Sequence, residues 1–250
     1  MFRITETVKV LIITNVLFYV GALTLGEGAY KLFALQFPEH PNFRVWQILT
    51  SMWMHDMRSI GHILFNMLML FMFGSQLEAY LGQKKFLFIY FSAGLGATAL
   101  HFLILYLGYF PGYEAFSVSG FSKAEILQFM NEGQYNTRVW EVADESTIQR
   151  MFNSFHTSAA GASGAIFGIL MAFAVYFPNL QIFLLFLPIP IKAKYLIGGY
   201  FALNVISAFS GIAIIGDPST GFWAHIGGGI IGLICAWYWK KNSFNSHRLN

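Results

Sequence analysis

Six long apolar runs constrain this chain more than any other feature of its sequence. They cover residues 8–25, 61–81, 86–109, 157–177, 193–215 and 220–239. An α-helix needs about 20 consecutive apolar residues to cross a bilayer, and the runs approach or exceed that length. The chain is 56% hydrophobic and only 11% charged, whereas soluble domains carry about 25% charged residues. The sequence therefore predicts an all-α, multi-pass integral membrane protein with six transmembrane helices.

Charges and prolines mark the ends of these runs. The first run follows Arg3 and has no small-residue cleavage site behind a short apolar core, which predicts a retained signal anchor. Residues 183–191 are also apolar, but Pro188 and Pro190 are unfavourable inside a helix, so we expect a connecting loop there. We expect residues 1–250 to form one membrane domain.

The distribution of basic residues predicts the orientation of the chain. If the N-terminus is on the inner side of the membrane, nine basic residues, including Arg248, and two acidic residues fall on that side. Six basic residues, including Arg138, and ten acidic residues then fall on the outer side. Basic loops are retained in the cytoplasm, so we expect both termini there, and the retained anchor indicates a bacterial inner (plasma) membrane. The net charge of +3 is spread between loops and forms no stripe that would bind nucleic acid.

Two long segments are expected on the outer side. Residues 26–60 are rich in aromatic side chains, which predicts a structured loop lying partly in the membrane interface. Residues 111–156 form a polar insertion between the third and fourth spans, for which we expect a solvated or membrane-resting loop rather than a substrate-recruiting role. Within it, Ser122 and Glu125 have the spacing of a capping box and predict a short amphipathic helix over 122–130.

Four polar residues are expected to share one depth in the membrane. The chain enters the second, fourth and sixth spans from the same side, so His62, Asn66, Ser163 and His225, all near the starts of these spans, lie in one layer. Buried ionisable residues in a membrane are costly and indicate function. A neutral His225 can take the proton of Ser163 and make it a nucleophile. The Asn66 amide, the His62 ring and a backbone N–H at the start of the fourth helix can stabilise the resulting oxyanion.

Glycines beside this layer predict close packing of two helices. Gly164 and Gly168 follow Ser163, and Gly228 and Gly232 follow His225, each pair at small-xxx-small spacing. Such stripes let membrane helices approach closely. A close approach of the fourth and sixth helices is what a direct hydrogen bond between the serine and the histidine requires.

Two other kinds of catalytic site do not fit the sequence. The nucleophile elbow of soluble α/β hydrolases has Gly two residues after the serine, where this chain has Ala165. No acidic third member accompanies the pair, because Glu78 falls near the inner end of its span, so we expect a dyad. His62 and His225 are potential metal ligands, but the chain lacks a His-Glu-x-x-His pattern and a carboxylate in the outer layer. We expect neither a metal nor a cofactor.

These residues resemble the motifs of the rhomboid intramembrane serine proteases, over about residues 46–239. Gly161-Ala162-Ser163-Gly164 is similar to the family's GxSG motif, Ala224-His225 with Gly228 and Gly232 to its AHxxGxxxG motif, and His62 with Asn66 to its HxxxN element. The resemblance implies a rhomboid-type six-helix bundle without a cofactor. It also implies that transmembrane protein substrates are cut near the membrane surface, with the fifth span and a cap loop as gate.

By the same resemblance, each motif residue receives a role. Ser163 is the nucleophile, His225 the general base and acid, and Asn66, His62 and Gly161, with the Ser163 amide, stabilise the oxyanion or the substrate. Glu78, twelve residues after Asn66, stands where the family often has a structural glutamate.

Two positions depart from the family pattern. Gln47 stands where the family often has an arginine that anchors the first loop. Phe167 replaces the tyrosine of some members, and we expect its ring to pack on His225 without supplying a hydroxyl.

Two alternative functions fit the sequence less well. An inactive rhomboid-like protein that binds or escorts membrane proteins would share the fold, but loss of Ser163 or His225 would indicate it, and both are present. A small transporter or channel would show charged residues or broken helices near mid-membrane and repeat symmetry, which the sequence lacks. The sequence favours an intramembrane serine endopeptidase and leaves its substrate and oligomeric state open.

Overall fold

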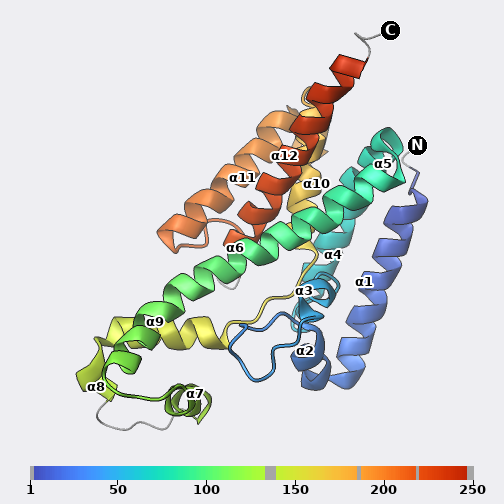
Figure 1. The fold of residues 1–250 in the computed structure, drawn as a ribbon. Helices are drawn as coiled ribbons and strands as arrows, with labels where there is room; N and C mark the ends of the chain where they lie inside the picture. Colours follow the sequence, from blue (N-terminus) through green and yellow to red (C-terminus); the bar gives the residue numbers. More distant parts are fainter. Residues whose placement is uncertain (1–2, 133–138, 185–186, 218–219, 247–250) are drawn as a thin grey trace.

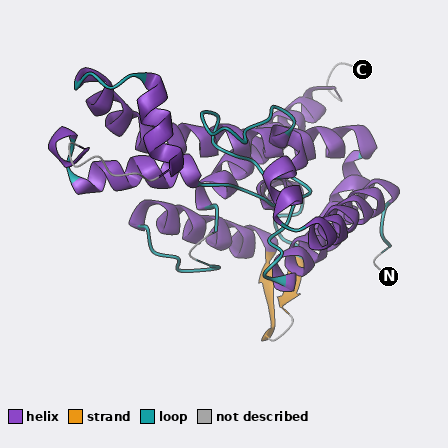
Figure 2. Ribbon diagram, turned by 90° about the horizontal axis from the view of Figure 1, so that it is seen from below, coloured by secondary structure: helices purple, strands orange, loops and turns teal. Residues whose placement is uncertain are grey.

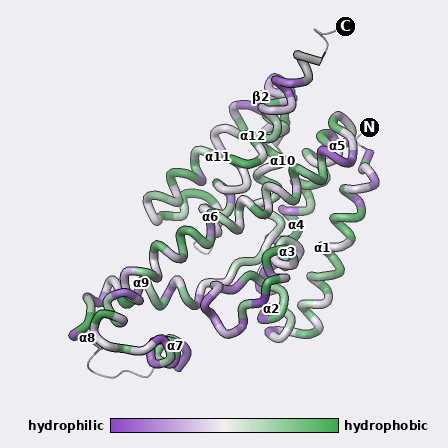
Figure 3. The backbone as a smooth tube through the Cα atoms, viewed as in Figure 1, coloured by the Kyte–Doolittle hydropathy of each residue, from purple (hydrophilic) through white to green (hydrophobic). Residues whose placement is uncertain are grey.

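The computed structural model describes residues 3–132, 139–184, 187–217 and 220–246. Arg138 and Arg248, which were counted in the charge distribution, lie outside these residues. The described chain is a bundle of long helices with a group of short helices packed at one end, and both termini lie at the other end (Figure 1). Hydrophobic residues run along the long helices, whereas hydrophilic ones gather at α7 and in the loop between α2 and α3 (Figure 3).

Each of the six apolar runs contains a helix. The helices of the bundle are α1 (Glu6–Leu25), α4 (Ile60–Met69) with the π-helical turn η1 (Leu70–Gly74) and α5 (Ser75–Leu81), α6 (Gln83–Val118), α10 (Ser163–Tyr176), α11 (Ala193–Ser210) and α12 (Phe222–Ser246). Among the described residues, four helices are long and apolar enough to cross a membrane: α1, the combined helix Ile60–Leu81, α6 and α12. The other two, α10 and α11, are shorter. The prediction of a helical membrane bundle is thus confirmed.

The fourth helix begins later than the sequence predicted. Residues 157–161 are extended, and the backbones of Leu35 and Ala159 exchange two hydrogen bonds of 2.8 and 2.9 Å. The backbone N–H of Gly161 donates to Ser51 O at 2.9 Å, and its φ of +143° favours glycine. The prediction of a span from residue 157 was wrong because partners in the loop between α1 and α4 satisfy this backbone, which therefore does not need to be helical.

The third helix is longer than predicted. Its 36 residues continue through Pro111 to Val118, whereas the sequence placed the start of a polar segment at Pro111. A proline inside a helix removes one hydrogen bond. The helix nevertheless continues because Tyr109 and Phe116, on either side of the proline, are both buried against the following helices.

The insertion forms a packed helical unit instead of an irregular loop. It contains α7 (Lys123–Glu132), α8 (Val139–Val142) and α9 (Glu145–His156), and these pack on the C-terminal part of α6. The buried apolar cluster that joins this unit to α6 and to the loop before α3 comprises Phe37, Leu105, Tyr109, Phe116, Ile126, Met130, Ile148, Met151 and Phe155. The capping box is confirmed: Ser122 N–H donates to Glu125 Oε2 at 2.8 Å and Glu125 N–H donates to Ser122 Oγ at 3.3 Å.

The described residues 183–184 and 187–191 lie in two paired strands rather than in a loop without regular structure, and residues 185–186 lie outside the described residues. Strand β1 (Gln181–Leu184) pairs antiparallel with β2 (Leu187–Lys192), with Gln181 opposite Lys192 and Ile182 opposite Ile191 (Figure 2). The prolines of β2 exclude a helix, as predicted. They are compatible with a strand because each strand of a two-stranded sheet has one unpaired edge, where a missing N–H is tolerated.

One buried amide anchors the loop between α1 and α4, which contains α2 (Glu27–Phe33) and α3 (Gln47–Thr50). The Gln47 side chain is fully buried. Its Oε1 accepts from the backbone N–H groups of Gln36 (3.3 Å) and Arg44 (3.1 Å), and its Nε2 donates to the carbonyls of Lys31 and Asn42, both at 2.9 Å. The loop is structured, as expected, and an amide anchors it in place of an arginine.

Glu78 joins the second span to the start of α1. Its carboxylate accepts from the backbone N–H groups of Thr7 (3.3 Å) and Val8 (3.1 Å) and from the Thr5 hydroxyl. These N–H groups belong to the first turn of α1, where helix donors lack internal partners. Glu78 thus has the structural role that the sequence implied.

The backbones of α10 and α12 touch at two pairs of glycines. A Cβ atom added to Gly228 would lie 1.9 Å from Gly164 O, and one added to Gly232 would lie 2.1 Å from Gly168 O. Both distances are far below a van der Waals contact, so a side chain at either position would force the helices apart.

A third helix, α6, takes part in the same packing. A Cβ atom on Gly164 would lie 2.4 Å from Ala97 Cβ, and one on Gly168 would lie 2.2 Å from Ala93 Cβ. Gly227 of α12 approaches Gly96 of α6 in the same way, since its Cβ would lie 2.5 Å from Gly96 O. The three helices α6, α10 and α12 therefore form a tightly packed group, of which the sequence indicated only two members.

We predict that Gly232→Ala destabilises the protein by about 1–3 kcal/mol, the usual cost of overpacking a core. Thermal unfolding in detergent measures the effect. Gly198→Ala on α11 is the matched control, because an added Cβ there meets nothing within 4 Å, and alanine is favoured over glycine in a helix. Equal unfolding temperatures for the two variants would contradict the packing described here.

Gln47→Glu is predicted to destabilise the first loop. The glutamate retains an acceptor but loses the two donors to Lys31 O and Asn42 O, and it places a buried charge beside these carbonyls. We expect a loss of about 1–3 kcal/mol or more in unfolding free energy. The same change at exposed Gln149 serves as the control and should alter the unfolding temperature little.

Candidate active site

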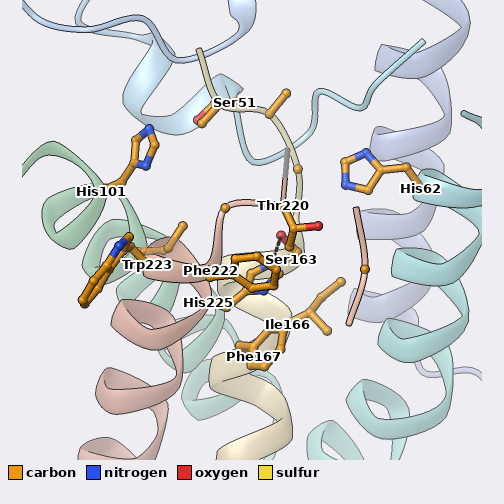
Figure 4. A pocket seen from close by; sticks show the side chains of 18 of the residues that line it. Ser51, His62, His101, Ser163, Ile166, Phe167, Thr220, Phe222, Trp223 and His225 are labelled. Atoms are coloured by element: carbon orange, nitrogen blue, oxygen red, sulfur yellow. Dashed lines mark hydrogen bonds between the residues drawn. The ribbon is translucent and has the colours of Figure 1, made fainter. Parts of the chain in front are cut away.

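The N-terminal ends of α4, α10 and α12 surround a cavity of about 1090 Å³. Its polar lining includes His62 and Asn66 of α4, His101 of α6, Ser163 of α10 and His225 of α12. Figure 4 shows Ser163 and His225 in contact, with the His62 ring across the cavity. The structure thus brings the four polar residues singled out in the sequence around one space.

Ser163 is the first residue of α10. The first intrahelical bond runs from Ile166 N–H to Ala162 O at 2.9 Å, so the N–H groups of Ser163, Gly164 and Ala165 have no acceptor within the helix. In the described part of the chain, no side chain caps this end. The positive end of the helix dipole therefore lies beside the Ser163 hydroxyl.

His225 lies in the first turn of α12 and reaches the serine directly. Its Nε2 lies 2.9 Å from Ser163 Oγ, the contact drawn in Figure 4. The Phe167 ring stacks on the imidazole with a centroid distance of 4.3 Å and an interplanar angle of 14°. The Tyr200 ring of α11 stacks on Phe167 at 5.0 Å. These stacked rings fix the plane of the imidazole.

A further partner of His225 was missed in the sequence. The Nδ1 atom of His225 lies 2.7 Å from Oδ1 of Asn204, a buried residue of α11. The sequence pattern predicted a dyad because it contains no acidic third member. The sequence does show Asn204 as a polar residue within the apolar run 193–215. Its depth in the bundle and the direction of its side chain depend on how the helices pack.

His62 presents a donor to the cavity. The backbone N–H of Asp56 donates to His62 Nδ1 at 3.2 Å, so in the neutral ring the proton is on Nε2. A Cβ atom on Gly161 would lie 3.2 Å from His62 Nε2 and 3.5 Å from Ser163 Oγ. Gly161 therefore lies between the two polar groups, where a side chain would fill the space that they share.

Asn66 lies one helical turn after His62 and also lines the cavity. It is only 5% exposed, and its Nδ2 donates to His62 O at 2.7 Å. This bond uses one of the two amide hydrogens. The cavity thus has amide, imidazole and backbone N–H donors near Ser163.

The cavity offers serine and imidazole chemistry. Within the described ranges, no three His, Cys, Asp or Glu side chains lie close enough together to hold a metal ion. The hydroxyl in contact with an imidazole and the surrounding donors are suited to acyl transfer.

Comparison with known proteins identifies the family of this chain. The family profile described as the rhomboid domain matches residues 42–242. Over 199 residues the chain is 29% identical to "Rhomboid protease AarA" of Providencia stuartii, covering 76% of this chain and 54% of the relative. It is 25% identical over 183 residues to "Rhomboid protein 1, mitochondrial" of Saccharomyces cerevisiae, covering 72% and 38%.

A third relative, "Rhomboid-like protein 15" of Arabidopsis thaliana, is 30% identical over 109 residues, which are 43% of this chain and 27% of the relative. This chain therefore spans about half or less of the length of the relatives it matches. Because the family profile covers most of the bundle, including all the cavity residues discussed above, the chain belongs to the rhomboid family of integral membrane proteins.

Proposed function

We propose that this protein is an intramembrane serine endopeptidase that hydrolyses peptide bonds in or near the transmembrane segments of other membrane proteins. The observation that carries the proposal is the 2.9 Å contact between Ser163 Oγ and His225 Nε2 inside a large cavity lined by hydrogen-bond donors. Membership of a family that includes a named protease supports it.

In the first step, His225 Nε2 takes the proton of the Ser163 hydroxyl as the oxygen attacks the substrate carbonyl carbon. The carbonyl oxygen becomes an oxyanion. The pair is already within hydrogen-bonding distance, so the attack needs no rearrangement of either side chain.

The oxyanion needs donors that are oriented before the reaction. We assign this role to His62 Nε2–H, the Asn66 amide and the backbone N–H of Ser163. Gly161 lacks a side chain that would occupy the space between His62 and Ser163. The N-terminus of α10 adds the positive end of its dipole at the same place.

Collapse of the oxyanion breaks the peptide C–N bond, and the imidazolium of His225 returns its proton to the leaving amine. The acyl group is then bound to Ser163 Oγ as an ester. A water molecule, deprotonated by the same His225 Nε2, attacks the ester carbonyl. The bond between the acyl carbon and Ser163 Oγ then breaks, the imidazolium returns its proton to Oγ, and the acid product leaves.

The position of the cavity sets where cleavage would occur. The candidate residues lie at the N-terminal ends of α4, α10 and α12, away from the end of the bundle that holds both chain termini (Figure 1). With the termini in the cytoplasm, as the charge distribution predicts, cleavage occurs toward the outer side of the membrane. The assignment to a bacterial inner membrane rests on the sequence alone, since the relatives come from a bacterium, a yeast and a plant.

We expect Ser163→Ala and His225→Ala each to lower cleavage of a transmembrane substrate by about a thousandfold or more, because loss of either member of such a pair removes the nucleophilic step. Cleavage by purified protein in liposomes measures this. Ser158→Ala, which alters another serine of the same cavity, is the matched control and should retain activity.

A fluorophosphonate probe that reacts with activated serines separates an enzyme from an inactive binding or escort protein. Wild type and Ser158→Ala should be labelled, and Ser163→Ala should not. Absence of labelling in folded wild type, together with absence of cleavage for several substrates, would favour the inactive alternative.

Asn66→Ala and His62→Ala are expected to lower kcat by about 10²–10³ with a smaller change in KM, since an oxyanion donor acts in the transition state. Steady-state kinetics on a fluorogenic transmembrane substrate measures both constants. His101→Gln, which alters a cavity residue without an assigned role, is the control. A change in KM alone for Asn66→Ala and His62→Ala would argue against oxyanion stabilisation.

A further inference from the structure

We propose that Asn204 is a positioning residue that holds His225 in the tautomer with its proton on Nδ1, leaving Nε2 as the acceptor that faces Ser163. The consequence for catalysis rests on the proposed function, whereas the tautomer itself does not. The sequence pattern of serine and histidine contains no such third member, and two contacts of one buried amide support this role.

The first contact fixes which way the amide points. Asn204 Nδ2 lies 2.8 Å from the backbone carbonyl of Tyr200. A carbonyl oxygen only accepts hydrogen bonds, so the atom that faces it is the NH₂ group and not the amide oxygen. The oxygen Oδ1 of Asn204 is therefore the atom that faces the imidazole.

The second contact fixes the proton on the ring. Asn204 Oδ1 lies 2.7 Å from His225 Nδ1, and an amide oxygen also only accepts, so Nδ1 must carry the hydrogen. A neutral imidazole has one N–H, which leaves a lone pair on Nε2. The Ser163 hydroxyl, 2.9 Å away, then donates to Nε2, the direction that proton transfer to a general base requires.

Because both residues are buried, water cannot readily replace Asn204 as the acceptor for His225 Nδ1–H. Asn204 is 1% exposed and His225 is 6% exposed. An unpaired Nδ1–H at this depth would lose its hydrogen bond without a water to restore it. The opposite tautomer would put the N–H toward Ser163 and a lone pair toward Oδ1, which pairs two acceptors.

The amide and the aromatic stack restrain different motions of the ring. Phe167 stacks on the face of the imidazole and fixes its plane. The contacts at Nδ1 and Nε2 restrain rotation of the ring about the axis normal to its plane. Asn204 does this without adding a buried charge, which an aspartate at the same place would bring.

The charged state of His225 also gains from the amide. Once Nε2 holds the serine proton, Nδ1–H still donates to Asn204 Oδ1, and a bond from a cation is stronger than one from a neutral ring. The other titratable groups that line the cavity with His225 are Tyr30, Asp56, Arg58, His62, His101, Tyr200 and Asp217.

Nitrogen-15 NMR of histidine-labelled protein in liposomes tests the tautomer without any need for activity. The comparison uses Ser163→Ala and the double variant Ser163→Ala/Asn204→Ala, with His225→Gln to identify the His225 signals. We expect the protonated nitrogen of the neutral ring to be Nδ1 in Ser163→Ala and this preference to be lost in the double variant. Protonation at Nε2 in Ser163→Ala, or identical spectra for both, would overturn the proposal.

Kinetics tests the consequence for catalysis. We expect Asn204→Ala to lower kcat by about tenfold, the order expected for loss of one buried hydrogen bond, with KM nearly unchanged. Asn204→Asp retains an acceptor and adds a negative charge that favours the imidazolium, so the acidic limb of its kcat/KM profile should move to higher pH by about one unit. We expect Asn204→Asp to retain more activity than Asn204→Ala and to show this shifted pH profile. A purely structural role of Asn204 would not produce the shift.

Ser207→Ala is the matched control, because Ser207 lies one turn along α11, is equally buried and accepts from Ile214 N–H instead of contacting His225. It should leave the pH profile unchanged. An unaltered kcat for folded Asn204→Ala, or the same loss in Ser207→Ala, would overturn the positioning role. If wild type proves inactive, the proposed function fails, and the NMR comparison alone decides the tautomer.

Discussion

Backbone contact between α10 and α12 is the constraint on which the site depends. In a membrane, helices gain little from burying apolar surface against one another, so they associate through close packing and polar contacts. Ser163 immediately precedes Gly164, and His225 lies one turn before Gly228. The contact that brings Gly164 O against Gly228 therefore also brings the serine hydroxyl within reach of the imidazole. Any side chain at these glycines would separate the two functional groups along with the helices.

The remaining wall of the cavity depends on the loop between α1 and α4. Ser51 of this loop binds the backbone of Gly161, and Leu35 pairs with Ala159, so the loop sets where the extended segment ends and α10 begins. Asp56 binds Nδ1 of His62 and turns its other nitrogen toward the cavity. Gln47 holds the loop itself in place. The fold thus holds Ser163, His225 and the surrounding donors in fixed positions, which the proposed stabilisation of an oxyanion requires.

The fifth helix of the bundle, α11, contributes two residues to the surroundings of His225. Tyr200 supports the stack on His225 through Phe167, and Asn204 contacts Nδ1 of the ring. If Asn204 sets the tautomer as we infer, the position of α11 and the protonation state of the base are linked. A displacement of α11 would then remove an acceptor from His225 as well as open space beside the cavity.

The sequence by itself determined the helical membrane class, the shared layer of His62, Asn66, Ser163 and His225, and the glycines that follow the last two. These features follow from run length and residue spacing along one helix, which are local. Only the tertiary structure decided that α10 starts at Ser163, that α6 continues past Pro111, that Gln47 anchors the loop and that Asn204 reaches His225. Each of these depends on which distant group satisfies a buried donor or acceptor. The partner of each buried polar group is determined when the helices pack, because the spacing of residues along the chain does not specify which polar groups on different helices will meet.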